Sequence, residues 1–357
     1  MPKSYIKYPR TSAAVPWDIA ALAKAYDWPT GLAGGGDIAI GELGGGWVQS
    51  DIDQFCKMIG MPVPTIVDHS VNGATNNGDP TDDASGEVAL DIEAAAASYW
   101  VATGKAPTIH MYWAPNANAS IQAATAQAAV DGRDVLSWSW GTDEANTGRA
   151  ACQSMEATVQ DAISRGMVVL AAAGDNDSSD GGYTPANVDS PSSCPHVISC
   201  GGTRKVGAVF TPKDETVWNN NPGNTDGSGT GGGFSTIFTM PIWMSGAPHG
   251  GRMVPDVAAN ADPETGVEIV LNGKVIAIGG TSFVAPFYAG LIAACGKKRG
   301  LLRPDGIGPL LWSHHMAFND ITKGNNGLYR AKVGPDACTG LGSPIGSKIA
   351  ALLAGLP

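Results

Sequence analysis

Apolar and polar positions divide this chain into two kinds of segment that alternate. Short β-type apolar runs are followed by longer amphipathic or alanine-rich segments with helical spacing. The runs predict strands at 37–43, 65–69, 108–113, 135–140 and 167–173, and the longer segments predict helices at 17–26, 50–59, 86–101, 120–130 and 150–165. Such alternation is typical of an α/β fold, in which helices cover both faces of a mostly parallel sheet. Because no linker interrupts the pattern, we expect a single domain over 1–357.

A glycine turn follows a further apolar run at 275–278 and precedes an apolar helix expected at 283–295. Gly279 and Gly280 permit a tight strand-to-helix turn, which would place Ser282 at the N-terminus of that helix. Backbone N–H groups there can stabilise negative charge, as a serine nucleophile requires. Helix capping by Thr281 or Ser282 is the alternative, and the turn alone does not separate the two.

The predicted helix at 86–101 carries two acidic residues on one face. Glu87 and Asp91 are four residues apart, and the helix contains no lysine or arginine to neutralise them. A pair of buried carboxyl groups has separated pKa values and can perform acid–base chemistry. The alternative is a solvated acidic face. Glu93 falls on a different face and is expected to be an ordinary surface residue.

A second acidic candidate is Asp175, which follows the strand expected at 167–173. It would lie at the carboxyl edge of the sheet, where active sites of such sheets occur, although a turn aspartate is the alternative. None of the six histidines lies in a glycine-rich motif that opens a helix. The usual base of a serine hydrolase is therefore missing, and Glu87 is the better candidate.

The C-terminal part contains aspartates within Gly/Pro/Asn turns. Asp320 and Asp336 could offer carboxylate oxygens, and neighbouring carbonyls could complete the oxygen cage that calcium prefers. Plain turn chemistry is the alternative. The six cysteines form no C-x-x-C pair, which argues against zinc, and Cys194 and Cys200 could either form a bridge or stay reduced.

The bulk composition excludes several classes of protein. The net charge of −11 makes nucleic acid an improbable partner, and no apolar run reaches the length of a membrane helix. Residues 1–10 lack the apolar core of a signal peptide. No glycine motif opens a helix in the way that dinucleotide binding requires.

Six motifs in order resemble the sedolisin family, the serine-carboxyl peptidases, and most of all its kumamolisin-like members. They are GELGGG at 41–46, GEVALDIE at 86–93, SWG at 139–141, AAAGD at 171–175, GGTS-x-x-x-P at 279–286 and DIT-x-GNN at 320–326. The likeness extends over essentially the whole chain. It implies a subtilisin-like fold and the hydrolysis of peptide bonds in acid.

The resemblance also implies roles for the matching residues. Ser282 would be the nucleophile, Glu87 the general base and Asp91 its carboxylate partner. Asp175, kept protonated, would donate to the oxyanion, because an ionised carboxylate could only repel it. Glu42 and Trp140 would form an outer hydrogen-bonded relay behind the pair.

Substrate and metal positions follow from the same resemblance. An extended peptide would pair with residues 137–141 and 231–233, which include Ser139, Gly141, Gly231 and Gly232. Asp189 would favour a basic residue next to the cleavage site. One structural Ca²⁺ would be held by the side chains of Asp320 and Asp336 and by the carbonyls of Ile321, Lys332 and Gly334. Lys332 stands where the family pattern usually has glycine, so its carbonyl is the least secure ligand.

Relatives of this type also suggest a secreted monomer, normally made with a prosegment to which nothing in this chain corresponds. The chain is then either an expressed mature form or one that naturally lacks a prosegment. Three other functions stay open: an inactive peptide-binding relative, a hydrolase of other esters or amides, and a structural calcium-binding module.

Overall fold

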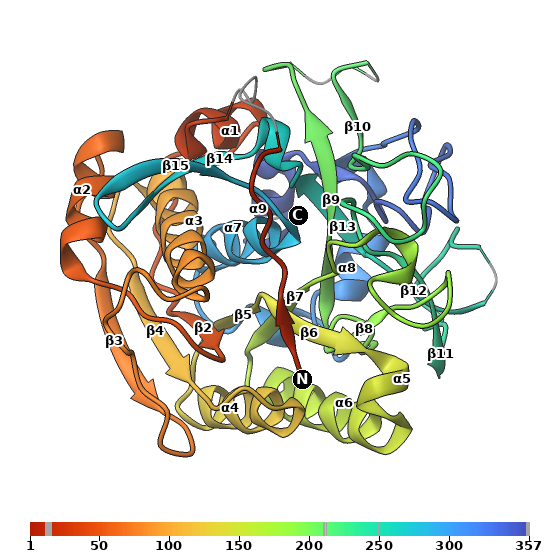
Figure 1. Cartoon of the computed structure of the whole chain (residues 1–357), viewed down its shortest axis with the longest axis horizontal. Coiled ribbons are helices and arrows are strands. Elements are labelled where there is room, and N and C mark those ends of the chain that lie inside the picture. The colour runs from red at the N-terminus through yellow and green to blue at the C-terminus, as the bar shows by residue number, and fades with distance from the viewer. Residues whose placement is uncertain (11–15, 210, 212, 249, 355–357) are drawn as a thin grey trace.

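The computed structural model describes residues 1–10, 16–209, 211, 213–248 and 250–354, and an eight-stranded sheet lies at its centre (Figure 1). The strand order is β10-β9-β7-β5-β2-β4-β3, with β13 also paired to β9. Every pair is parallel except β10–β9. The strands of this sheet are β2 (Ile38–Glu42), β3 (Thr65–Ser70), β4 (Thr108–Trp113), β5 (Val135–Trp138), β7 (Val168–Ala172), β9 (Ile198–Lys205), β10 (Glu215–Val217) and β13 (Val257–Asn260). The expected α/β fold is confirmed.

The five expected strands and the six expected helices are all present. The α-helices are α1 (Ile19–Ala25), α2 (Gln49–Ile59), α3 (Ser85–Thr103), α4 (Asn118–Val130), α5 (Glu144–Thr147), α6 (Arg149–Ser164), α7 (Thr281–Ala294), α8 (Gly308–Trp312) and α9 (Gly346–Leu353). The strand expected at 135–140 differs, because the sheet strand β5 ends at Trp138 and a separate strand begins at Trp140.

Smaller sheets surround the central one. They are formed by β1 (Lys3–Ser4), β6 (Trp140–Asp143) and β8 (Asp189–Ser190), by β11 (Gly233–Thr239) with β12 (Gly251–Val254), by β14 (Val267–Leu271) with β15 (Lys274–Ile278), and by β16 (Phe318–Asn319) with β17 (Ser343–Pro344). Short 3-10 helices lie at Asp177–Ser179, Pro263–Thr265, Arg299–Leu302 and His315–Ala317.

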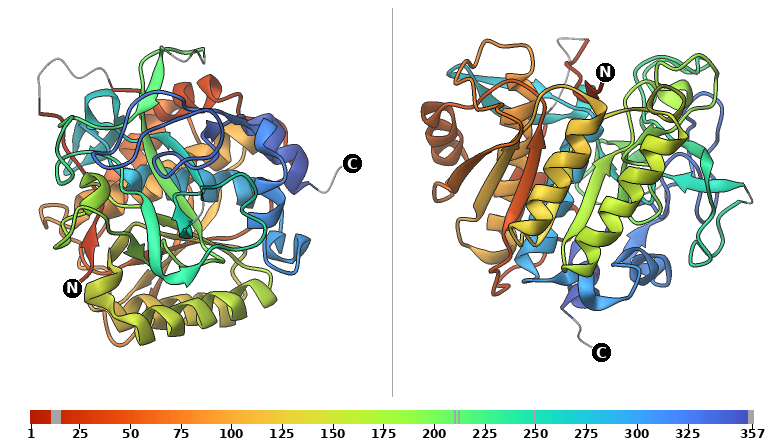
Figure 2. Two further views of the ribbon diagram at one scale, coloured as in Figure 1. Left: turned by 90° about the vertical axis from the view of Figure 1, so that its right-hand side faces the viewer. Right: turned by 90° about the horizontal axis from the view of Figure 1, so that it is seen from below.

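The sheet is buried on both faces, as its near-continuous apolar strands predict. Ile38 and Ile40 of β2 belong to the core shared with α3 and α7, whereas Ala39 belongs to a second core. That second core contains residues of α4 and α6, which lie side by side in Figures 1 and 2. Successive side chains of a strand point to opposite faces, so one strand supplies both cores.

Helices α3 and α7 pack directly against each other, and both are almost fully buried. Gly290 allows this close approach, since a Cβ at that position would lie 2.5 Å from the Ala95 carbonyl oxygen and 2.7 Å from Ser98 Oγ. The helix that begins beside Ser282 and the helix that carries Glu87 therefore form one rigid pair.

No helix among the described residues is long and apolar enough to cross a membrane. The predicted domain of 1–357 also includes 11–15, 210, 212, 249 and 355–357, which lie outside the described residues.

Candidate active site

Ser282 lies in the first turn of α7, directly after the turn that leaves β15. Gly280 adopts φ 120°, a backbone conformation that side chains rarely tolerate, so the glycine is required there. Helix α7 has Gly280 as its N-cap and no side-chain capping hydrogen bond. The helix-cap interpretation of Thr281 or Ser282 is therefore wrong. Ser282 is fully buried, and its hydroxyl lies 3.5 Å from the carbonyl oxygen of Ser139, which is a long contact.

Glu87 and Asp91 lie on α3, and neither side chain is exposed to solvent. Burial raises the pKa of Glu87 well above its usual range, and the nearby charge of Asp91 raises it further. The hydroxyls of Ser282 and Ser4 act in the opposite direction on this pKa. The solvated-face alternative is therefore excluded, because this acidic pair is inside the protein and close to Ser282.

A second layer of polar groups lies behind this pair. Trp140 donates its indole N–H to Glu42 Oε2 over 2.8 Å, and the Ser139 hydroxyl donates to Asp91 Oδ1 over 2.8 Å. Burial raises the pKa of Glu42 and that of Asp91 well above their usual values, and the charge of the neighbouring carboxyl adds to each effect. Glu42, Asp91 and Glu87 therefore form a coupled set that favours bound protons.

Asp175 reaches the same site from the end of β7. Its Oδ1 accepts hydrogen bonds from the backbone amide and the hydroxyl of Thr281, whereas its Oδ2 has no partner. Burial raises the pKa of Asp175 to about 7, against the opposing effects of Lys7 and Thr281. In acid this carboxyl group is protonated and can donate a hydrogen bond from Oδ2.

The N-terminal segment that contains β1 runs in extended form across the front of the molecule in Figure 1. Lys3 and Ser4 pair antiparallel with Gly141 and Trp140 of β6, and the amide of Tyr5 donates to the Ser139 carbonyl over 3.1 Å. Beyond Tyr5, Lys7 exchanges two 2.8 Å hydrogen bonds with Gly279. The segment therefore lies across the site as an added strand.

The carbonyl of Tyr5 lies at the centre of this site. It accepts a 3.1 Å hydrogen bond from the backbone amide of Ser282. A Cβ on Gly280 would lie 2.1 Å from this carbonyl oxygen and 2.6 Å from Asp175 Oδ2, so both oxygens occupy the same small space. A peptide carbonyl is thus held beside the serine, between an amide donor and the unpartnered carboxyl oxygen.

The other expected substrate residues lie around this segment. Asp189 of β8 is opposite Asp143 of β6, and both its carboxyl oxygens are buried without partners. Burial raises the pKa of Asp189 to about 7, and the charge of Lys3 lowers it. The amide of Gly231 donates to the Gly174 carbonyl, and the carbonyl of Gly232 accepts from Asn326. The segment pairs with β6, not with 231–233.

The prediction that Glu93 is an ordinary surface residue is wrong. It is only 1% exposed, and its carboxylate accepts a 3.0 Å hydrogen bond from the amide of Val270 in β14. Burial raises the pKa of Glu93 well above its usual range. The small β14–β15 sheet, which the sequence did not predict as a cover for α3, encloses this face of the helix.

The aspartates expected to bind calcium lie in one loop region. Asp320 Oδ2 accepts from the amide of Gly334, and Asp336 Oδ2 accepts from the amide of Lys332. Asp336 is buried, and burial raises its pKa to about 6. Ile321 is also buried next to Asp320. Two carboxylates, one of them buried, supply oxygens of the kind that calcium prefers, and the described residues contain no group of three or more acidic, histidine or cysteine side chains that could hold a metal ion.

Histidines and cysteines take no part in the described site. His69 contacts His110 on β3 and β4, and His196 contacts Glu156 of α6. None of the described histidines hydrogen-bonds Ser282. All six cysteines are free, so Cys194 and Cys200 do not form a bridge.

Sequence reasoning missed Thr281, which orients Asp175, and Asp180, which supports it. Asp180 Oδ1 accepts hydrogen bonds from the backbone amides of Asp175 and Asn176. Thr281 could have been found, because it stands directly beside the serine in a glycine turn. Asp180 gave no signal, since an aspartate in a polar loop usually makes turns.

Comparison with known proteins gives consistent results. A sequence model of the subtilase family matches residues 71–314. The chain is 42% identical to kumamolisin from Bacillus sp. (strain MN-32) over 95% of its length, and 28% identical to sedolisin from Pseudomonas sp. (strain 101) over 95%. It spans only 64% and 61% of the lengths of these two curated relatives.

Solved structures support the same relationship. The structure titled Pseudomonas sedolisin (serine-carboxyl proteinase), complexed with two molecules of pseudo-iodotyrostatin, superposes with a TM-score of 0.80 at 27% identity. The match covers 96% of this chain and 99% of that one. Sphericase, at 20% identity and a TM-score of 0.56 over 94% of this chain and 99% of the other, shows a likeness of fold alone. The expected subtilisin-like fold is confirmed.

Proposed function

The chain belongs to the subtilase family and, within it, to the sedolisins of the kumamolisin type, and from this membership we propose that it is a serine-carboxyl peptidase active in acid. The observation that carries the proposal is the position of the Tyr5 carbonyl. An ordinary peptide bond lies between the amide of Ser282 and the unpartnered Oδ2 of Asp175, with Glu87 buried beside the serine.

Ser282 attacks the carbonyl carbon of the bound peptide, and Glu87 takes the proton from its hydroxyl. Asp91 shares a proton with Glu87 and is itself fixed by the hydroxyl of Ser139. Glu42 and Trp140 hold Asp91 in an environment that retains protons. Glu87 then returns its proton to the departing amine, and water releases the acyl group by the reverse sequence.

The oxyanion that forms needs hydrogen-bond donors in fixed positions. The Ser282 amide supplies one, and protonated Asp175 supplies the second from Oδ2. Since Asp175 donates only below its pKa of about 7, this arrangement supports activity in acid. A neutral imidazole base is not required, because the carboxyl set performs the proton transfers.

We also propose that one Ca²⁺ stabilises the loop region through Asp320, Asp336 and the carbonyls of Ile321, Lys332 and Gly334. The ion would supply the positive charge that these two carboxylates lack. Secretion and a monomeric state stay predictions.

The test is digestion of casein and of a peptide library at about pH 3–5, where carboxyl groups titrate, with every product identified by mass spectrometry. We expect peptide cleavage that disappears in Ser282→Ala. Binding without cleavage would instead indicate an inactive relative. Hydrolysis of esters with intact peptides would indicate a different hydrolase, and a stability response to calcium without any turnover would leave only a structural calcium module.

The same product map tests Asp189. If it accepts a basic residue beside the cleaved bond, the map shows arginine or lysine enriched there and Asp189→Ala removes the enrichment. An unchanged map in the variant would contradict that role.

A further inference from the structure

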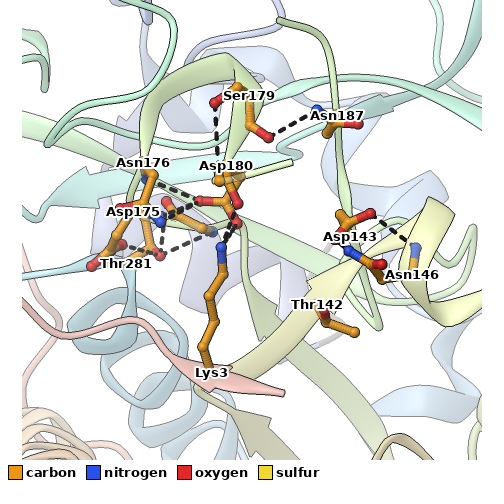
Figure 3. Close-up of polar contacts among 12 residues, drawn as sticks. Lys3, Thr142, Asp143, Asn146, Asp175, Asn176, Ser179, Asp180, Asn187 and Thr281 are labelled. Atoms are coloured by element: carbon orange, nitrogen blue, oxygen red, sulfur yellow. Dashed lines mark hydrogen bonds and ion pairs between the residues drawn. The ribbon is translucent and has the colours of Figure 1, made fainter. Parts of the chain in front are cut away.

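Asp180 ends the short 3-10 helix that follows β7, and its carboxyl group is bonded to the backbone of Asp175 (Figure 3). Its Oδ1 accepts hydrogen bonds from the backbone amides of Asp175 and Asn176, over 3.0 Å and 2.9 Å. The side-chain amide of Asn176 adds a 3.3 Å contact to the same oxygen. The carboxyl group of Asp180 therefore fixes the backbone from which the side chain of Asp175 extends to Thr281.

The same carboxyl group packs against the bare backbone of Gly174, the residue before Asp175. A Cβ on Gly174 would lie 2.5 Å from Asp180 Cγ and 2.6 Å and 2.7 Å from its two oxygens, so only glycine leaves room for it. Asp180 is itself buried. Asp175 is thus held from two sides, because Thr281 bonds its side chain and Asp180 bonds its backbone.

The backbone at Asp180 adopts an unfavourable conformation. Its φ of 42° lies in the left-handed region, which residues with a side chain seldom adopt. Such conformations persist only where the surrounding structure holds them, and they gather at functional sites. Aspartate and asparagine tolerate this region better than other residues, because their short polar side chains bond to nearby backbone. Asparagine can therefore replace Asp180 and remove its charge without a new demand on the backbone.

Charged groups from several elements surround Asp175 and Asp180. They are Lys3 and Lys7 of the N-terminal segment, Glu87 of α3, Asp177 of the 3-10 helix and Asp189 of β8. The Lys3 ammonium lies 3.1 Å from Asp180 Oδ2, so both oxygens of this carboxyl group face donors, as those of an ionised carboxylate do. A peptide bound along β6 would take the place of Lys3 and leave this charge beside Asp175 without a lysine partner.

We propose that Asp180 is a positioning residue that keeps Asp175 protonated and thereby sets the upper pH limit of peptide cleavage. This inference rests on the proposed peptidase function and names a residue that controls its oxyanion donor. A carboxylate disfavours the ionisation of a second carboxyl group beside it, and burial strengthens the effect. Burial raises the pKa of Asp175 to about 7, and the charge of Asp180 acts in the same direction, whereas Lys7 and Thr281 oppose it.

The first experiment measures kcat against pH, from about pH 3 to about pH 9, because this profile reports groups that titrate in the enzyme–substrate complex. We expect Asp180→Asn to move the alkaline limb of the profile to lower pH by about 0.5–1 unit, the effect of removing a nearby like charge. A merely structural role would lower kcat by one factor at every pH and leave the limb in place. Asp53→Asn, an exposed aspartate on α2 that is bonded to Gln49, is the control and should not move the limb.

The second experiment removes the group on which Asp180 acts. In an Asp175→Asn background no carboxyl group is left to tune, so adding Asp180→Asn should not move the limb further. A peptide aldehyde gives a readout without turnover, because its reversible adduct with Ser282 places an oxygen at the oxyanion position. Its inhibition constant should rise as Asp175 ionises, and in Asp180→Asn this rise should begin about 0.5–1 pH unit lower.

The outcomes separate this inference from the proposed function. An alkaline limb that stays in place in Asp180→Asn, or a shift that persists in the Asp175→Asn background, overturns the role of Asp180 alone. If Asp180→Asn does not fold, Asn176→Asp makes the reverse test, because a carboxylate added beside Asp175 should move the limb to higher pH, and an unmoved limb overturns the inference. A wild-type chain that cleaves no peptide at any pH overturns the peptidase function itself.

Discussion

Thr281 holds one carboxyl oxygen of Asp175 with two hydrogen bonds, from its amide at 2.8 Å and from its hydroxyl at 2.7 Å. The second oxygen has no partner and lies beside the Tyr5 carbonyl. The carboxyl group is therefore unable to exchange its two oxygens freely, and its proton is directed to the place where an oxyanion would form.

This relationship predicts different behaviour for two variants of Asp175. Asp175→Asn keeps an acceptor for Thr281 and places an N–H donor at the position of Oδ2, so we expect most of the activity in acid and a slower loss as pH rises past 7. Asp175→Ala removes the donor and should lower kcat roughly 10²–10³-fold, the usual effect of losing one oxyanion donor. Profiles of kcat against pH test this, and equal inactivity of both variants at every pH would contradict it.

Ser282 and Glu87 should behave as one unit. We expect Glu87→Gln to lose nearly as much kcat as Ser282→Ala, and the double variant to be no worse than Ser282→Ala alone. Additive losses would contradict the shared role. Glu93→Gln is the matched control, because it changes a buried glutamate on the same helix that bonds to Val270 instead of Ser282. It should reduce stability and leave kcat largely intact.

The buried acids predict that the free energy of unfolding falls as pH rises from about 4 to about 7. In this range the unfolded chain has released protons that Asp175, Glu42, Glu87 and Asp91 still hold, so rising pH favours unfolding. Each fully retained proton contributes about 1.4 kcal/mol per pH unit. Urea unfolding at several pH values, with Ser282→Ala as the background to prevent self-digestion, measures the slope.

Asp175→Asn in the same background isolates one group and should make the slope shallower by up to one proton. His110 acts oppositely below about pH 6.5, because burial and the charge of Arg133 lower its pKa to about 4. Because both proteins contain His110, subtracting the slope of one from the slope of the other cancels the contribution of this histidine. Identical slopes would show that Asp175 is not protonated in the native state.

Calcium should raise the thermal midpoint if Asp320 and Asp336 bind it. Ligand binding to the native state adds stability that grows with the logarithm of the free calcium concentration, so a titration against Tm measures the affinity. Asp336→Asn should weaken the response, and Asp53→Asn should not. An equal Tm in calcium and in chelator would contradict the site.

Gly290→Ala should destabilise the protein by about 1–3 kcal/mol, the range for overpacking a core. The added methyl group would press on Ala95 and Ser98 of α3. Gly44→Ala is the control, because its Cβ would meet only an ordinary 3.7 Å contact with Ala84. An equal change in the urea midpoint for both variants would contradict the close packing of α3 and α7.

Periodicity predicted the first half of the sheet well and its second half poorly. The strands before 175 are apolar runs with clear helices between them. Strand β9 contains Gly201 and Gly202, and a Cβ at either would lie within 3 Å of a neighbouring side chain, so packing rather than propensity makes this segment a strand. The pattern of apolar and polar residues along the sequence does not show which segments pack together in this way.

The candidate site, like the sheet, could be predicted from the sequence only in part. The catalytic candidates Glu87 and Asp91 share a helix and could be paired from their spacing, and the motifs placed Ser282 and Asp175 with them. The contact between Lys3 and Asp180 spans 177 positions of sequence and depends on how the chain closes over the sheet. Glu93 was misplaced because its cover, β14, comes from a distant part of the chain.

The close packing of α3 against α7 has a consequence for the chain while it is still folding. Ser282 and Glu87 meet only because two buried helices lock together, and Asp175 joins them from a strand between the two cores. A chain that has collapsed without fixing those helices holds every reactive group and aligns none of them. The alignment that the proposed peptidase function requires therefore exists only after both helices have packed against each other.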